Sequence, residues 1–170
     1  MSAHKDDVSA WFTGRIPPDW AMGPLEFDSD RDEIVVTVPL PEPALDDSAT
    51  EDARATARRA RIEGFRNDTR RHRMVIADEA QSRFGRKVSW AARCGNEQET
   101  FTNLAAPAMT RLRLPERRVL DTLVDSGVAR SRAEALAWCV RLVGSHEGDW
   151  LAELRQALTE VERVRQEGPA

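Results

Sequence analysis

The chain is poor in the residues that mark membrane, secreted or metal-binding proteins. Its 170 residues include two cysteines, five tryptophans, five phenylalanines and no tyrosine. No apolar run approaches the roughly 20 residues that cross a bilayer, and the polar, acidic N-terminus lacks the layout of a signal peptide. Cys94 and Cys139 lie far apart and match no metal or redox spacing. We therefore expect a cytoplasmic protein with free thiols, no membrane association and no bound metal.

The sequence also lacks the residue patterns of an active site. No glycine-rich loop follows a strand, and no serine sits in a nucleophile elbow. His4, His72 and His146 are scattered along the chain, so we interpret them as surface residues. Cys94 follows Arg93 and is a candidate reactive thiol, although a structural or surface cysteine is the favoured interpretation. We expect no catalytic residue, no cofactor and no enzymatic activity.

Charge is distributed unevenly along the chain. The net charge of −4 divides into −10 over residues 1–53, +6 over 54–106, +3 over 107–143 and −3 over 144–170. A contiguous basic block between acidic ends suits a partner that is rich in phosphate, because only the local field meets the phosphates. Alternatively, the acidic arm neutralises the basic block within the folded protein. The sequence gives these two interpretations equal weight.

The N-terminal segment is expected to be acidic and proline-rich, with a β-hairpin. Prolines and glycines before residue 25 exclude a long helix there. Two apolar stretches, 25–27 and 34–38, flank a polar turn and predict the strands of the hairpin. The apolar residues before the hairpin indicate a docking segment, which packs either on a protein partner or, as we favour, on the protein's own core. These residues are Trp11, Phe12, Ile16 and Trp20.

A long basic helix and a second hairpin are expected next. From residue 50 to 83 the chain has strong helix formers, no proline and apolar residues at steps of three, four or seven, and Gly85 follows as a C-cap. Gly95 lies between two stretches, 87–93 and 99–104, that predict the hairpin. The helix arginines either contact phosphates or, as is slightly favoured, form a solvated face with intrahelical ion pairs. The candidates for secondary phosphate contacts are Arg58, Arg59, Arg66, Arg70 and Arg73.

A short alternating segment follows. Thr110, Leu112 and Leu114 are expected to point one way, while Arg111 and Arg113 point the other way. The pattern predicts a strand with one basic face and one buried face.

Two short helices are expected after this strand. Pro115 and Glu116 suit the first turn of a helix, and Gly127 ends it. Ser131 opens the second helix, and Glu134 completes a capping box. The expected buried positions are Leu120, Leu123 and Val124 with Val119 in the first helix, and Ala135, Leu136, Cys139, Val140 and Val143 in the second.

Residues 109–143 resemble the ribbon-helix-helix family. The resemblance rests on the strand followed by Pro-Glu, the glycine turn and the helix opening from Ser131 to Leu136, all at the family's spacing. A unit of about 35 residues cannot hold an independent core. In that family the strand pairs with its copy in a second chain, so the resemblance implies a homodimer that binds duplex DNA.

The resemblance also implies roles for individual residues. Arg111 and Arg113, with Met109, become the readers of base edges in the major groove. Ser131 and Arg132, at the start of the second helix, become the phosphate contacts. The implied function is that of a transcriptional regulator or an antitoxin-like repressor. The alternative is an interaction protein that keeps the fold as a dimerisation core and binds no DNA.

Together these expectations define an α+β protein of three segments. Residues 1–48 form the acidic arm with its hairpin, and residues 49–106 form the long basic helix and second hairpin. Residues 107–170 form the ribbon-helix-helix-like module with a terminal amphipathic helix over 149–167.

Overall fold

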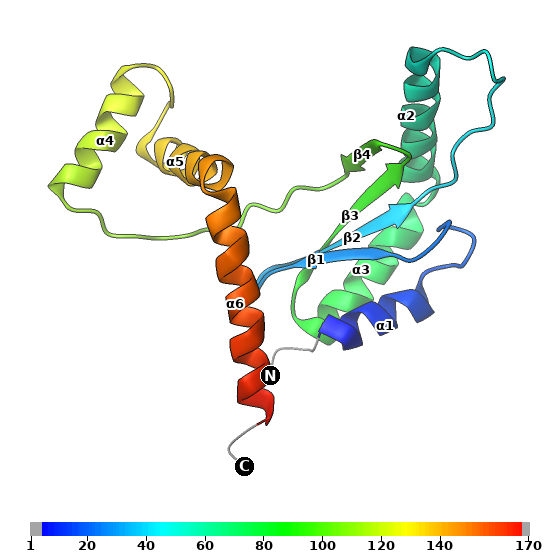
Figure 1. Cartoon of the computed structure of the whole chain (residues 1–170), viewed down its shortest axis with the longest axis horizontal. Helices are drawn as coiled ribbons and strands as arrows, with labels where there is room; N and C mark the ends of the chain where they lie inside the picture. Colours follow the sequence, from blue (N-terminus) through cyan, green and yellow to red (C-terminus); the bar gives the residue numbers. More distant parts are fainter. Residues whose placement is uncertain (1–4, 168–170) are drawn as a thin grey trace. The chain divides into compact units, whose positions relative to one another are not determined.

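The chain has an α+β fold that divides into two compact units, residues 1–107 and 108–170 (Figure 1). The computed structural model describes residues 5–167. The first two expected segments share one core and lie together in the first unit. The second unit begins next to the expected boundary at residue 107.

The first unit is built on a four-stranded sheet. Its strands are β1 (Glu26–Ser29), β2 (Glu33–Pro39), β3 (Lys87–Cys94) and β4 (Glu97–Thr100), in the order β1-β2-β3-β4. The outer pairs are antiparallel hairpins and the central pair is parallel. Both predicted hairpins are therefore confirmed, with β4 ending earlier than the sequence indicated.

Three helices pack with the sheet around one core. They are α1 (Lys5–Arg15), α2 (Glu51–Asp68) and α3 (Arg70–Phe84). Parallel neighbours such as β2 and β3 need a long crossover connection, and α2 and α3 provide it (Figure 1). Because side chains alternate along a strand, Val36 and its register partner Trp90 face the same core as Ile62 of α2 and Ile76 of α3.

The aromatic segment near the N-terminus packs on the protein's own core, as the favoured interpretation predicted. Phe12 is fully buried and Ile16 nearly so. Trp11 and Trp20 are partly buried against the same cluster. Trp20 meets Trp90 edge to face, with ring centroids 6.2 Å apart. These side chains therefore stabilise the first unit.

The expectation of one long helix from residue 50 to 83 is wrong, because the helix is interrupted at Thr69. The Thr69 hydroxyl donates to the Phe65 carbonyl at 2.5 Å and accepts from Arg73 Nε at 2.9 Å. Arg73 Nη2 donates to the Arg66 carbonyl at 2.7 Å. Side-chain donors thus satisfy carbonyls at the end of α2, and such hydrogen bonds compete with a continuous helix.

The second unit contains three helices, α4 (Leu114–Asp125), α5 (Arg132–His146) and α6 (Gly148–Glu167). Their bounds follow the predicted local signals. Pro115 lies in the first turn of α4, and Gly127 has the positive φ of 78° that ends this helix readily. Ser131 Oγ accepts from the Glu134 amide at 3.2 Å, and the Glu134 carboxylate accepts from the Arg130 amide at 2.8 Å.

The core of the second unit is small. Only Leu120, Ala129 and Ala135 are buried among the unit's described hydrophobic side chains. The expectation that Val140 and Val143 are buried is wrong for the single chain, where they are 65% and 48% exposed. The apolar face of a helix is buried only where another element packs on it, and no described element of the single chain packs on this part of α5.

Residues 102–113 have no regular secondary structure in the single chain, and α4 begins at Leu114. Among the described residues, none of 108–113 joins the sheet of the first unit. Pairing of this segment with a second chain stays a prediction. No helix within residues 5–167 is long and apolar enough to cross a membrane.

Candidate nucleic-acid interface

The segment before α4 presents two unpaired arginines. Arg111 and Arg113 are exposed, and no carboxylate of the described residues forms an ion pair with either. Between them, Leu112 is half-buried and packs on the unit's core. Arg117 Nη1 donates to the Leu112 carbonyl at 2.7 Å, which ties the segment to the first turn of α4. Leu112 therefore lies inward between two exposed arginines, but the predicted strand is not formed and Thr110, expected on the same side as Leu112, is exposed.

Two further side chains of this segment are exposed. Met109 is fully exposed, so its side chain is accessible to a partner. Leu114, expected beside Leu112 on the buried side, is 51% exposed instead. Its backbone is already the first residue of α4, so it no longer follows the alternation of an extended segment.

The start of α5 holds the two predicted phosphate contacts, Ser131 and Arg132. Arg132 is engaged with Asp121 of α4, with Nε 2.6 Å from Oδ1 and Nη2 2.7 Å from Oδ2. The hydrogen bond from Arg132 holds the pKa of Asp121 below its ordinary value. A phosphate at this site would therefore compete with Asp121 for the guanidinium. The amide groups at a helix N-terminus offer a second means of holding an anion.

Asp121 is the residue of this site that the sequence did not indicate. It lies 11 positions before Arg132, and the two residues meet because α4 and α5 pack against each other. Sequence spacing predicts an ion pair only within one helix, where the two partners lie three or four residues apart. No local signal identifies a pair across two helices.

Four of the five candidate arginines in the first unit have internal partners. Arg58 contacts Glu42, Glu51 and Asn96, and its side chain is 12% exposed. Arg59 pairs with Glu97, and Arg66 pairs with Glu99. Arg73 is 6% exposed and donates to Thr69 and to the Arg66 carbonyl. Arg70 is exposed and has no ion pair among the described residues.

These partners differ from those expected. Glu42 comes from the arm, Glu97 and Glu99 come from β4, and only Glu51 lies in the same helix as its partner Arg58. Arg93 likewise pairs with Glu26 of β1. The geometry therefore favours internal neutralisation for most of the basic block, and leaves Arg70 as the candidate phosphate contact with a free charge.

The residues considered for catalysis do not gather at one place. Cys94 is fully buried, its Sγ lies 3.6 Å from the Pro41 carbonyl, and burial raises the pKa of its thiol. His72 contacts the edge of Trp20, and His4 lies outside the described residues. Within residues 5–167, no group of three or more His, Cys, Asp or Glu side chains is arranged to hold a metal ion.

Comparison with known proteins gives matches along nearly the whole chain. The family model of the N-terminal domain of Rv1265-like proteins matches residues 6–100, and that of the Mb1296 C-terminal domain matches residues 113–165. The chain is 54% identical over 174 residues to the uncharacterised proteins Mb1296 of Mycobacterium bovis and Rv1265 of Mycobacterium tuberculosis, with 99% of this chain and 74% of each relative covered. The chain belongs to the Rv1265-like family. The two matched regions lie in the two structural units, one in each. No solved structure matches.

Proposed function

We propose that the protein is a homodimeric, sequence-specific DNA-binding protein in which residues 109–114 of two chains pair as a ribbon. The observation that carries this proposal is the exposure of Arg111 and Arg113, without acidic partners, on either side of an inward Leu112. A guanidinium fork matches the O6 and N7 acceptors of guanine in the major groove. Met109 would lie beside these readers.

The apolar surface of the second unit supports the dimer. The described part of this 63-residue unit has three buried hydrophobic side chains, and a small unit that buries so little apolar surface is marginally stable. Seven large apolar side chains are exposed on the unit's first half, and a second copy with its own pair of short helices would cover them. They are Met109, Leu114, Val119, Val128, Val140, Leu142 and Val143.

The start of α5 would position the dimer on the DNA backbone. Ser131 orders the first turn of α5. The backbone amides of this turn, together with Arg132, would hold a phosphate once Arg132 leaves Asp121. A protein of this kind would act in the cytoplasm as a transcriptional regulator or an antitoxin-like repressor.

A second candidate function is an interaction protein that dimerises and binds no DNA. The Arg132–Asp121 ion pair favours it, because this arginine is already neutralised. The exposed apolar stripe of α6 also favours it, since a protein partner would cover such a stripe. The stripe consists of Trp150, Leu154, Leu158 and Val161.

Two measurements on the full chain separate these functions. Sedimentation equilibrium gives the oligomeric state, and fluorescence anisotropy with a labelled random duplex gives the affinity between roughly 50 and 200 mM salt. We expect a dimer whose log K falls linearly with log salt, and an Arg111→Gln, Arg113→Gln double variant that loses affinity for a selected site with little change in this slope, because base contacts give specificity and phosphate contacts give salt dependence. Arg141→Gln, an exposed change late in α5, is the matched control. A dimer without duplex binding would support the interaction protein, and a monomer without binding would contradict both functions.

A further inference from the structure

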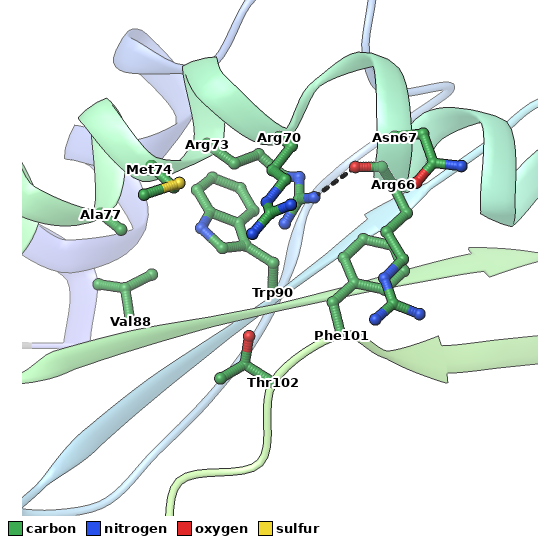
Figure 2. Close-up of a pocket in the computed structure, with 10 residues that line it drawn as sticks. All are labelled: Arg66, Asn67, Arg70, Arg73, Met74, Ala77, Val88, Trp90, Phe101 and Thr102. Carbon is green, nitrogen blue, oxygen red and sulfur yellow. Dashed lines mark hydrogen bonds between the residues drawn. The ribbon is translucent and has the colours of Figure 1, made fainter.

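A pocket of about 450 Å³ lies in the first unit where α2 meets α3, beside β3 and the residues after β4 (Figure 2). This volume is within the range of small-molecule sites in proteins. Arg66, Arg70 and Arg73 supply its basic side, and Trp90 and Phe101 supply its aromatic side. Arg70 is also a candidate contact with DNA phosphate, but neither the DNA-binding proposal nor the alternative depends on the pocket.

The pocket carries positive charge that the protein does not neutralise. Arg66 pairs with Glu99 at 2.8 Å. No carboxylate in the described part of the chain pairs with Arg70 or Arg73. Arg73 is 6% exposed, and a buried charge without a counter-charge is rare because it loses its hydration. An anion in the pocket would supply the missing counter-charge.

Arg73 is held in place while most of its donors stay available. Its Nε and one Nη2 proton donate to Thr69 and to the Arg66 carbonyl, which leaves three of the five guanidinium protons. Its carbon Cζ lies 4.7 Å from the centroid of the Phe101 ring. Burial and the neighbouring charges of Arg66 and Arg70 lower the pKa of Arg73 to about 10, so it remains protonated at neutral pH.

A second, independent feature also lacks a partner. Trp90 is 4% exposed and lines the pocket, and its indole Nε1 is buried with no hydrogen-bond acceptor. Buried donors are almost always paired with protein or ligand acceptors. In Figure 2 this nitrogen is on the side of the ring toward Ala77 and Val88, away from the arginines. Nε1 has no accessible surface, so a ligand cannot reach it, and the pocket offers an anion site at one end and an apolar wall at the other.

We infer that this pocket binds a small aromatic acid, with its carboxylate or phosphate held by Arg70 and Arg73. Arginine forks suit both kinds of oxyanion. The apolar wall formed by Met74 and Val88 contacts the body of the ligand.

The experiment uses the full chain and four probes: phenyl phosphate, benzoate, inorganic phosphate and the neutral benzyl alcohol. Binding is measured by isothermal titration calorimetry at low salt and by tryptophan fluorescence. We expect phenyl phosphate or benzoate to bind more tightly than inorganic phosphate and benzyl alcohol, because only an aromatic acid combines an oxyanion for the arginines with a ring for the apolar wall. The stronger of the two identifies the oxyanion.

Two variants locate the binding. Arg70→Gln removes an exposed charge at the pocket and should weaken binding of the probe by about tenfold, as expected for one charge-assisted contact. Arg71→Gln changes the adjacent exposed arginine outside the pocket lining and should leave binding unchanged. Circular dichroism checks folding.

Two results would overturn the inference. One is that no acidic probe binds more tightly than benzyl alcohol. The other is that Arg70→Gln leaves probe binding intact while it weakens binding to duplex DNA, which would place this arginine on a DNA-contacting surface. The probe titrations do not depend on duplex binding, so the pocket and the DNA-binding proposal fail separately.

Discussion

Arg132 and Asp121 form a two-point ion pair that joins the first turn of α5 to the middle of α4, with contacts of 2.6 and 2.7 Å. Both side chains are about half exposed. The pair has two consequences. It stabilises the packing of two helices that share a small core, and it occupies two hydrogen-bond donors of a predicted phosphate contact.

The first prediction concerns stability and pH. Arg132 lowers the folded pKa of Asp121, so the carboxylate stabilises the fold above the ordinary Asp pKa of about 3.9, and this stabilisation is lost as pH falls through the lowered value. Asp121→Asn should therefore lower the melting temperature near neutral pH, and the gap in melting temperature between the variant and the unchanged protein should shrink in acid. Differential scanning calorimetry between about pH 3 and pH 7 measures this gap.

Asp125→Asn is the control for this prediction, because Asp125 is exposed near the end of α4 and has no ion pair among the described residues. It should show no comparable pH-dependent difference. Equal curves for the two variants would mean that the ion pair contributes nothing to the fold.

The second prediction concerns DNA. Asp121→Ala frees the Arg132 guanidinium, so duplex binding should strengthen and the slope of log K against log salt should steepen by roughly 0.9 for one added phosphate contact. Sequence preference should stay the same, because a phosphate carries no sequence information. Arg132→Ala should weaken binding to all duplexes. If Asp121→Ala leaves the slope unchanged, Arg132 is a structural residue of the helix pair.

The third prediction tests the cap of α5. Ser131→Ala removes the hydroxyl that accepts from the Glu134 amide, and should lower the free energy of unfolding by about 1 kcal/mol. Urea denaturation at fixed protein concentration measures this change. Ser145→Ala is the control, since Ser145 is exposed in the last turn of the same helix, where its hydroxyl contacts only the Leu142 carbonyl and the neighbouring His146 ring and caps no helix start. A loss of the same size in both variants would show that the cap has no special contribution.

Local signals predicted the helix ends and the hairpins well. Gly85, Gly127 and the Ser131–Glu134 pair each act within a few residues of their position, so the sequence contains the whole signal. The interruption at Thr69 was missed because the surrounding helix formers dominate the pattern. Three consecutive weak helix formers, Asn67 to Thr69, were the available warning.

Long-range pairing could not be predicted in the same way. Arg58 meets Glu42, and Arg66 meets Glu99, only after the sheet has formed. The pocket beside Trp90 likewise combines two helices, a strand and the segment after another strand. In the second unit, Val140 and Val143 have the spacing of buried residues, but their burial requires a surface that one chain does not contain.

The fourth prediction tests this missing surface. Val140→Lys places a charge on the exposed face of α5, and should weaken the dimer by roughly 100-fold, since a buried unpaired charge costs several kcal/mol. Val75→Lys makes the same change at a residue of α3 that is 50% exposed, compared with 65% for Val140. Sedimentation equilibrium should show dissociation only for Val140→Lys. Dissociation of neither variant would place the dimer contact elsewhere.

The fifth prediction separates base readers from phosphate contacts. Arg113 is exposed and unpaired next to an inward Leu112, so it would be free to meet a base edge. Arg113→Ala should weaken binding to a preferred site, selected from a random duplex library, by about 1–3 kcal/mol and weaken binding to random duplex much less. Anisotropy titrations at one salt concentration measure both affinities.

Two variants interpret the result. Arg132→Ala should lower both affinities to a similar degree, because a contact with phosphate is independent of sequence. Arg141→Ala, at an exposed position in the second half of α5, should change neither. If Arg113→Ala and Arg132→Ala reduce the binding affinity for every duplex by the same amount, the segment from 109 to 114 does not read bases. The second unit would then act as a basic dimerisation core, whose selectivity must come from another surface.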